Sequence, residues 1–178
     1  MRYPRIILLS VVLALAGVIG VAAAAGNTVY VPMVGKPAPP PATATPPAAN
    51  VAQQLLDLTN AERSRISNCP ALVLNPQLTA AAQTHAADMA TNNFMEHAGS
   101  DGSSAGERAL RAGYGSGVVG ENIAAGYATA QSVFTAWMRS GGHRDNLLNC
   151  SYTETGIGYQ SRTGTTYTQY WTHMFARP

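Results

Sequence analysis

The sequence predicts an α+β domain over residues 51–178, and three observations support this class. Apolar residues recur with the helical period in several segments between residues 51 and 148. Residues 155–176 have the pattern of two strands separated by a turn. Helices followed by strands, without regular alternation of strand and helix, are typical of α+β folds rather than of parallel sheets.

The first predicted helix covers residues 51–67, and the Asn-Cys-Pro sequence that follows ends it. The helical spacing groups one set of residues on a single face: Leu55, Leu56, Leu58, Glu62 and Ile66. Residues 71–74 are expected to form a short extended segment.

The second predicted helix opens with Asn75 as its N-cap and Pro76 at its first helical position. Four residues on it fall on one stripe that we expect to be buried: Leu78, Ala82, His85 and Met89. Because His85 lies on this stripe, we expect it to be a hydrogen-bonded core histidine rather than a ligand.

A loop is expected over residues 93–104, a short helix over 105–113, and irregular structure over the glycine-rich residues 114–128. Two short motifs here are chance matches. "GSGVVG" (115–120) lacks the preceding strand and following helix of a dinucleotide site. "GSSAG" (102–106) follows a polar loop, whereas a nucleophilic serine elbow follows a buried strand.

Thr129 is expected to cap a helix over residues 130–140. The pair Gly141–Gly142 breaks this helix, and residues 143–149 form one further turn. The C-terminal hairpin turns around Arg162–Gly164.

Two segments precede the predicted domain. Residues 1–25 combine an arginine-containing start, an uncharged apolar run and small residues at the end, which is typical of a secretory signal peptide. The alternative is an uncleaved membrane anchor. Both interpretations place the domain outside the cytoplasm, either secreted or tethered to the cell surface. Residues 26–50 are rich in Pro, Ala and Thr and are expected to form an extended linker.

The charge of the domain differs from that of the whole chain. Of the 11 basic residues, three (Arg2, Arg5 and Lys36) precede residue 51, so the domain carries eight arginines against nine acids. It has no lysine and no basic cluster. Electrostatic binding to nucleic acid is therefore not expected.

The two cysteines, Cys69 and Cys150, lie in a domain that we expect to be exported to an oxidising compartment. We predict that they form a disulfide, which by the loop-entropy model contributes roughly 3–5 kcal/mol. The alternative is two free buried thiols.

Three polar residues stand in unusual surroundings. His97 lies in "FMEHAG", Glu121 in "GENIAAG" and His143 in "SGGHRDN". Sequence spacing alone does not show that they lie close together in space.

Seven stretches, in order, resemble the CAP superfamily of cysteine-rich secretory proteins, antigen 5 and pathogenesis-related proteins, and most closely its bacterial secreted branch with the SCP domain. They are "LTNAERS", "LNPQLTAAAQTHAADMATNNFMEH", "GERALRAGY", "GENIAAGY", "AWMRSGGHRDNLLN", "TETGIGY" and "YWTHMFA". Together they cover nearly all of residues 51–178.

The resemblance implies an α-β-α sandwich, with a small central antiparallel sheet flanked by helices and a large cleft. It also implies that the cleft holds a tetrad of two histidines and two acids. His97, Glu121 and His143 match three members of this tetrad. Ser140 occupies the position of the second acid, and Asp145 is a candidate to compensate. His173 falls where relatives often have glutamine, which suggests an additional polar group nearby.

Two imidazoles with water form a site suited to a divalent ion, so zinc is the candidate cofactor at His97, Glu121 and His143. Glu121 would either bind the metal or fix the tautomer of a histidine. The alternative is a polar network that braces the cleft without a metal.

The resemblance leaves three classes of function open. The first is a non-enzymatic extracellular binding module, monomeric, with a lipid or protein ligand in the cleft. The second is a metal-dependent hydrolase that acts on proteins, with Glu121 as general base. The third is a component of the cell envelope that uses the domain as a scaffold. The sequence leaves open whether the protein is an enzyme, and it favours the non-enzymatic role.

Overall fold

The structure is a computed structural model that describes residues 48–178. The predicted leader (1–25) and nearly all of the predicted linker (26–50) lie outside the described residues. The described chain forms, in order, α1 (Ala48–Arg63), β1 (Val73–Leu74), α2 (Pro76–Asn92), α3 (Ala105–Arg111), β2 (Gly120–Ala125), α4 (Ala130–Arg139), α5 (Gly141–Leu148), β3 (Glu154–Ser161) and β4 (Gln169–Ala176). None of these helices has the length and apolar character that a bilayer-spanning helix needs.

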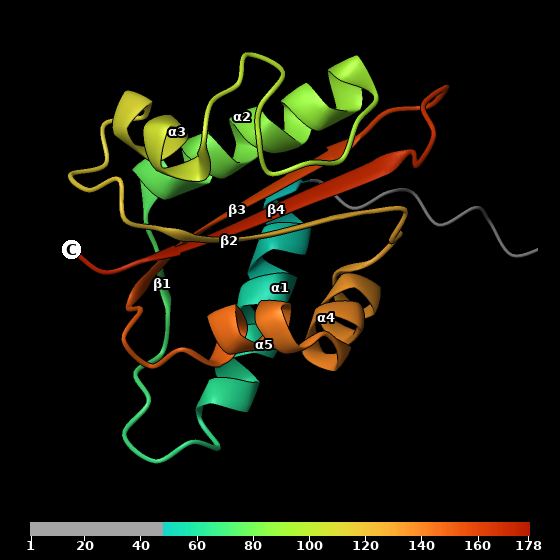
Figure 1. Ribbon diagram of the computed structural model, residues 1–178. Helices are drawn as coiled ribbons and strands as arrows, with labels where there is room; N and C mark the ends of the chain where they lie inside the picture. The colour runs from blue at the N-terminus through green and yellow to red at the C-terminus, as the bar shows by residue number, and fades with distance from the viewer. Residues whose placement is uncertain (1–47) are drawn as a thin grey trace, which may run out of the picture. The chain divides into compact units, whose positions relative to one another are not determined.

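The domain has three layers, as predicted. Figure 1 shows α2 and α3 on one face of the sheet and α1, α4 and α5 on the other. The strand order is β1-β3-β4-β2. Pairs β3–β4 and β4–β2 are antiparallel, but β1 pairs in parallel with β3. The small sheet is therefore mixed, whereas we expected it to be wholly antiparallel. The difference comes from the two-residue strand β1, which runs in the same direction as β3.

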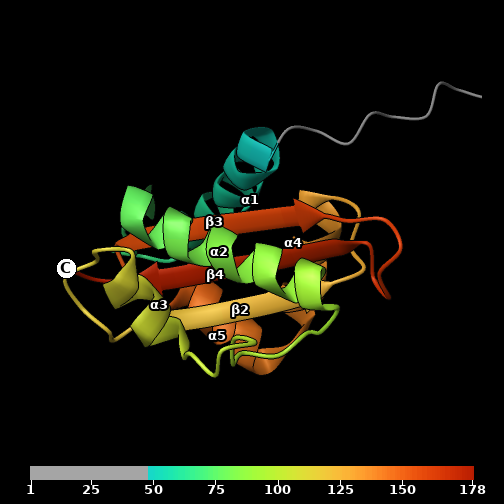
Figure 2. The same ribbon diagram turned by 90° about the horizontal axis from the view of Figure 1, so that it is seen from above.

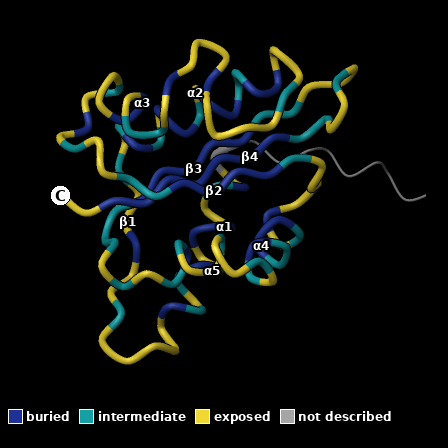
Figure 3. Tube along the Cα trace, viewed as in Figure 1, coloured by how far each residue is buried: buried dark blue, intermediate teal, exposed yellow. Residues whose placement is uncertain are grey.

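Strand β4 lies at the centre of the core, where side chains on both faces of the sheet are buried. Trp171 and Phe175 pack in the cluster with α1, α4 and α5, whereas Met174 packs with α2. Figure 3 shows this central strand as buried along most of its length. Coverage of both faces explains why apolar residues stand next to each other in β4, as at Tyr170–Trp171 and Met174–Phe175, instead of alternating with polar ones.

Helix α2 packs closely on β3, as Figure 2 shows from above. A Cβ atom at Gly156 or Gly158 would collide with the backbone of α2 at Leu78 and Ala82. Beyond the short strand β1, the Gln83 side chain contacts the edge of β3. Its amide donates to Tyr159 O and accepts from Tyr159 N, each at 3.1 Å.

The predictions for α2 and α4 are confirmed at their N-termini. The Asn75 side chain accepts hydrogen bonds from the first turn of α2, and Thr129 forms a capping box on α4. The stripe on α2 through Leu78, Ala82, His85 and Met89 is buried. Because Ser104 caps α3, the "GSSAG" motif is the start of a helix, as its sequence context indicated.

The face predicted for α1 is partly wrong. Leu55 and Leu56 are buried, but the buried face continues through Thr59 and Arg63. The helix ends at Arg63, so Ile66 lies beyond it and is 37% exposed. Burial of an arginine here is possible because its guanidinium donates to four backbone carbonyls, those of Pro70, Leu147, Asn149 and Tyr152.

The predicted disulfide between Cys69 and Cys150 is present, and it closes the same corner that Arg63 binds. The prediction of irregular structure over residues 114–128 is wrong for Gly120–Ala125, which is β2. After Ser140 the two glycines begin α5, so the break lasts one residue and the following helix extends to Leu148.

Candidate functional site

The three candidate residues gather along the outer edge of β2, where all three layers meet. Glu121 lies on β2, His97 on the loop that follows α2, and His143 in the first turn of α5. The Glu121 side chain is 3% exposed, whereas that of His97 is 61% exposed. A buried carboxylate therefore lies beside a histidine that is open to solvent.

Glu121 uses both carboxylate oxygens in hydrogen bonds. Oε1 is 2.8 Å from His97 Nδ1, and Oε2 accepts from the Arg108 guanidinium at 2.7 Å. Arg108 also donates to His97 O at 3.0 Å and to Ser103 O at 2.6 Å. Its guanidinium thus neutralises Glu121 and holds the backbone that carries His97.

Sequence reasoning missed Arg108. The burial of Glu121 points to such a residue, because a carboxylate this deeply buried requires a cationic or hydrogen-bonding partner. Arg108 stands beside the fully buried Ala109 on the inner side of α3 and is itself 6% exposed. Only the orientation of α3 against β2 identifies this arginine, among the eight in the domain, as the partner.

The His143 ring does not take part in the hydrogen bonds of the Glu121 carboxylate. Its Nδ1 lies 2.8 Å from Ser140 Oγ, and its carbonyl accepts from Asn122 Nδ2 at 2.9 Å. Burial lowers the pKa of His143, and the charge of His97 lowers it further. At neutral pH the ring is therefore uncharged, and its Nδ1 shares a hydrogen bond with the Ser140 hydroxyl. Ser140 is the residue that stands in the position of the expected acid. Asp145 is exposed on α5.

The expected zinc ligands do not form a ready cluster. Within the part of the chain that the structure describes, no group of three or more His, Cys, Asp or Glu side chains is arranged to hold a metal ion. Both oxygens of Glu121 are already engaged, so this residue fits the role of orienting His97 better than that of a ligand. His97 and His143 each have Nδ1 hydrogen-bonded, which leaves Nε2 as the candidate donor atom.

A largely apolar cavity of about 290 Å³ opens beside His143. Its apolar lining consists of Met95, Ile123, Ala124, Ala125, Tyr127, Ala136, Trp137 and Tyr167, and Ser140 and His143 supply its polar end. Trp137 is fixed there because its Nε1 donates to Ile123 O at 3.1 Å. Met95 and Tyr167 are each 42% exposed and form part of the rim.

The other two histidines lie away from this cleft. His85 is buried, and its Nε2 is 2.9 Å from Glu96 O, which confirms a core histidine. His173 is fully buried on β4 between Trp137 and Phe175, with ring centroids at 5.9 and 4.1 Å. It is therefore a core residue and does not extend the cleft.

Comparisons with known proteins agree with this geometry. The model of the cysteine-rich secretory protein family, CAP, matches residues 56–175. The uncharacterized protein YkwD of Bacillus subtilis is 35% identical over 117 residues, which are 66% of this chain and 45% of that protein. The uncharacterized membrane protein YlbC of the same organism is 33% identical over 106 residues, 60% of this chain and 30% of that one. This chain thus spans less than half of either relative.

Among solved structures, an extracellular protein containing an SCP domain from Bacillus anthracis has 35% identity and a TM-score of 0.65. The similarity covers 74% of this chain and 41% of that one. An outer surface protein from Borrelia burgdorferi has the same fold at 20% identity and a TM-score of 0.62, with coverage of 69% and 89%.

Proposed function

Because this chain belongs to the cysteine-rich secretory protein family, we propose that its domain is an extracellular module that binds a lipid or protein ligand in the cavity beside His143. The location is supported by similarity to proteins described as extracellular or as outer surface proteins. The binding role is carried by one observation: both oxygens of Glu121 are committed to Arg108 and His97, while a largely apolar cavity opens beside His143.

This arrangement favours binding over hydrolysis. A general base needs a lone pair that can reach a water or a substrate proton. Glu121 is 3% exposed, and each of its oxygens already faces a nitrogen of another side chain. Releasing Oε2 would leave the buried Arg108 guanidinium without its partner, which costs several kcal/mol.

The cavity has the composition of a site for an amphipathic ligand. Aromatic and aliphatic side chains line most of it, and a few polar groups at one end fix orientation, as in most small-molecule sites. An acyl chain or an apolar peptide side chain would occupy the aromatic part. A polar group on the ligand would meet Ser140 and His143.

A divalent ion is a separable part of the proposal. Zinc would be bound by Nε2 of His97 and Nε2 of His143 together with water, with Glu121 fixing the orientation of His97. Bound there, it would offer a point of attachment for an oxygen atom of the ligand. Calorimetry with zinc, on the wild type and on the His97→Ala/His143→Ala double variant, tests this part alone. Loss of binding in the double variant supports it, and absence of zinc binding by the wild type overturns it.

The binding role is tested with a dansylated fatty acid and a panel of apolar peptides, followed by fluorescence. Ala136→Trp fills the cavity, and we expect it to weaken binding of the active probe by at least about tenfold. The matched control is Ala128→Trp, which changes an exposed alanine outside the cavity lining. Equal binding by the two variants, or no binding of any probe by the wild type, contradicts the proposal.

A further inference from the structure

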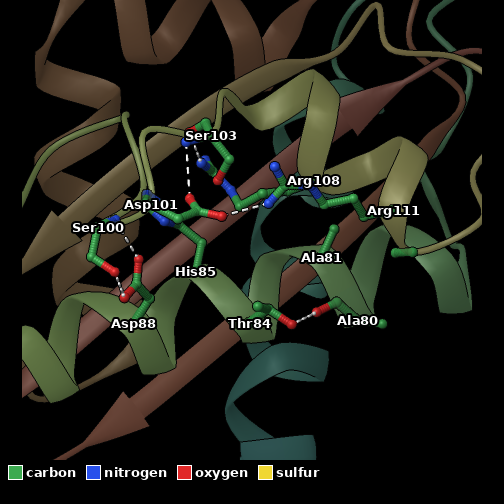
Figure 4. A pocket seen from close by; sticks show the side chains of 11 residues that line it. Ala80, Ala81, Thr84, His85, Asp88, Ser100, Asp101, Ser103, Arg108 and Arg111 are labelled. Atoms are coloured by element: carbon green, nitrogen blue, oxygen red, sulfur yellow. Dashed lines mark hydrogen bonds and ion pairs between the residues drawn. The ribbon is translucent and has the colours of Figure 1, made fainter.

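A second cavity lies on the other side of Arg108, between α2, α3 and the loop over residues 99–104. It has a volume of about 430 Å³, within the size range of small-molecule sites. Figure 4 shows His85 pointing from α2 toward this loop, with Arg108 and Arg111 approaching from α3. None of its lining residues belongs to the cavity beside His143.

Two buried nitrogens in the residues that line this second cavity have no hydrogen-bonding partner. One is Nδ1 of His85, a residue with no exposed surface, and the other is Nε of Arg108, which is 6% exposed. Each represents an unsatisfied polar atom in the interior, of a kind that native proteins rarely leave without water or a ligand. Other atoms of Arg108 are occupied by Glu121, His97 and Ser103.

The hydrogen-bonding roles of these two atoms are opposite. His85 Nε2 faces the carbonyl of Glu96, which can only accept, so Nε2 carries the hydrogen. Burial lowers the pKa of His85, so the ring is neutral and Nδ1 is a bare acceptor. Arg108 Nε always carries a hydrogen and is a donor. One group that accepts from Arg108 and donates to His85 is a hydroxyl.

Charge around the cavity is mixed, which favours a neutral ligand over a strongly ionic one. Asp88 and Asp101 oppose an anion, whereas Arg108 and Arg111 oppose a cation. Asp101 already pairs with Arg111 at 2.5 Å, and Asp88 accepts from the Ser100 hydroxyl at 2.6 Å. The remaining lining is made of small side chains, those of Ala80, Ala81, Thr84, Ser103 and Ala112. A ligand with hydroxyls on its edge and C–H groups on its face suits this combination.

We propose that this cavity binds a neutral, hydroxyl-rich small molecule of the monosaccharide type, whose hydroxyl groups accept from Arg108 Nε–H and donate to His85 Nδ1. The site is independent of the ligand proposed for the cavity beside His143. It is linked to that region through Arg108, whose terminal nitrogens hold Glu121 and the His97 backbone. A ligand in the second cavity that binds Arg108 is therefore expected to change the environment of His97 through this arginine.

The test is an NMR titration of the full chain with methyl glucoside, methyl mannoside and N-acetylglucosamine. Acetate and tetramethylammonium serve as charged comparison probes. We expect one or more of the sugars to shift the Arg108 Nε–H resonance in a saturable manner, with smaller shifts at His97 and none with the charged probes. The variant Thr84→Phe places an aromatic ring at an exposed position of the lining.

Thr84→Phe should weaken sugar binding by at least about tenfold, whereas Thr91→Phe should stay within about twofold of the wild type. Thr91 is an exposed threonine on the same helix and does not line the cavity, so it is the matched control. His85→Leu removes the acceptor and should abolish the shift of Arg108, with folding checked by the melting temperature.

Two results would overturn the proposal. One is the absence of any saturable sugar shift while Arg108 Nε–H shows contact with long-lived water, because a single buried water would then satisfy both nitrogens. The other is equal binding by Thr84→Phe and Thr91→Phe, which would place the sugar elsewhere. Neither result bears on the cavity beside His143, which the Ala136→Trp variant tests separately.

Discussion

The domain buries two arginines, Arg63 and Arg108, and the positive charge of each is compensated in a different way. Arg63 has no exposed surface and donates to four backbone carbonyls, three of them between residues 147 and 152. Arg108 pairs with the Glu121 carboxylate, donates to two carbonyls and leaves Nε without a partner. Arg63 thus donates only to the backbone, whereas Arg108 also binds a side chain and has one N–H group, at Nε, without an acceptor.

The groups that each arginine binds determine how far its surroundings can rearrange. Carbonyl groups of the backbone offer no alternative protonation state or rotamer, so Arg63 fixes the corner that also contains the disulfide. A carboxylate and a histidine ring can reorganise when a ligand or a proton arrives. On one side of the sheet a buried arginine therefore binds only backbone groups, whereas on the other side it binds side chains of the candidate site.

Replacing Arg63 should have the largest effect on stability. Arg63→Met leaves four carbonyls without their donor, and we expect the free energy of unfolding to fall by about 5 kcal/mol, at about 1–3 kcal/mol for each buried group. Urea unfolding followed by circular dichroism measures this change. The control is Arg65→Met, because the Arg65 side chain is 71% exposed and its loss should cost at most about 0.5 kcal/mol. Equal losses in the two variants would contradict the role given to Arg63.

Replacing Arg108 should come next. Arg108→Met leaves Glu121 buried and uncompensated, and breaking such a pair costs about 3–5 kcal/mol. Adding Glu121→Leu should recover more than half of the loss, because the double variant contains no isolated charge. No such recovery is expected when Glu121→Leu is added to Arg63→Met. Additivity of the Arg108 and Glu121 substitutions in the same unfolding assay would show that the pair is not coupled.

We expect the free energy of unfolding to decrease in acid because of His173, which lies on the same side of the sheet as Arg63. Burial, and to a lesser extent the charge of Arg63, lowers the pKa of His173 to about 3. Between this value and the ordinary pKa of about 6.5, the unfolded chain binds a proton that the folded chain does not. Stability should therefore be fully present above about pH 6.5 and decrease as the pH falls, by roughly 3 kcal/mol at pH 4.

His173→Leu removes this titration and should flatten the stability profile between pH 6.5 and 4. His143 and His85 have lowered pKa values as well, and they contribute in the same direction. Chemical denaturation at several pH values measures the slope. An unchanged slope in His173→Leu would mean that His173 takes up a proton in the folded state, with a partner such as a buried water.

The smallest effect is expected at an ion pair that resembles the Arg108 pair in chemistry but not in burial. Arg111 and Asp101 are 60% and 53% exposed, although they lie beside the second cavity. Arg111→Met should therefore change the free energy of unfolding by about 0.5 kcal/mol or less. A loss approaching that of Arg108→Met in the same assay would show that burial is not what distinguishes the two arginines of α3.

Sequence reasoning succeeded where the determining interaction is local. The N-cap at Asn75, the capping box at Thr129 and the hairpin pattern depend on neighbours within a few residues. It failed for β2, which begins with a glycine and contains Glu121 and Asn122, both polar and both buried. Strand formation there depends on pairing with β4, some fifty residues later, which no local pattern contains.

The site was predictable in part for the same reason. Resemblance to a known family brought His97 and Glu121 together, and the structure places them in hydrogen-bond contact. It could not supply Arg108, or the contact between His143 and Ser140, because both depend on how α3 and α5 are oriented against β2. Zinc binding by the histidines stays a prediction, because among the described residues no three His, Cys, Asp or Glu side chains are arranged to hold a metal ion.

Side-chain hydrogen bonds occupy backbone groups at two edges of the sheet, which are β2 and the part of β3 that extends beyond the two-residue β1. At β3 the Gln83 amide satisfies Tyr159, and at β2 Trp137 and Asn146 donate to the carbonyls of Ile123 and Glu121. Exposed strand edges with free backbone groups are templates for aggregation and domain swapping. Here side chains occupy the N–H and carbonyl of Tyr159 and two carbonyls of β2, which leaves a neighbouring copy fewer free backbone groups with which to extend the sheet.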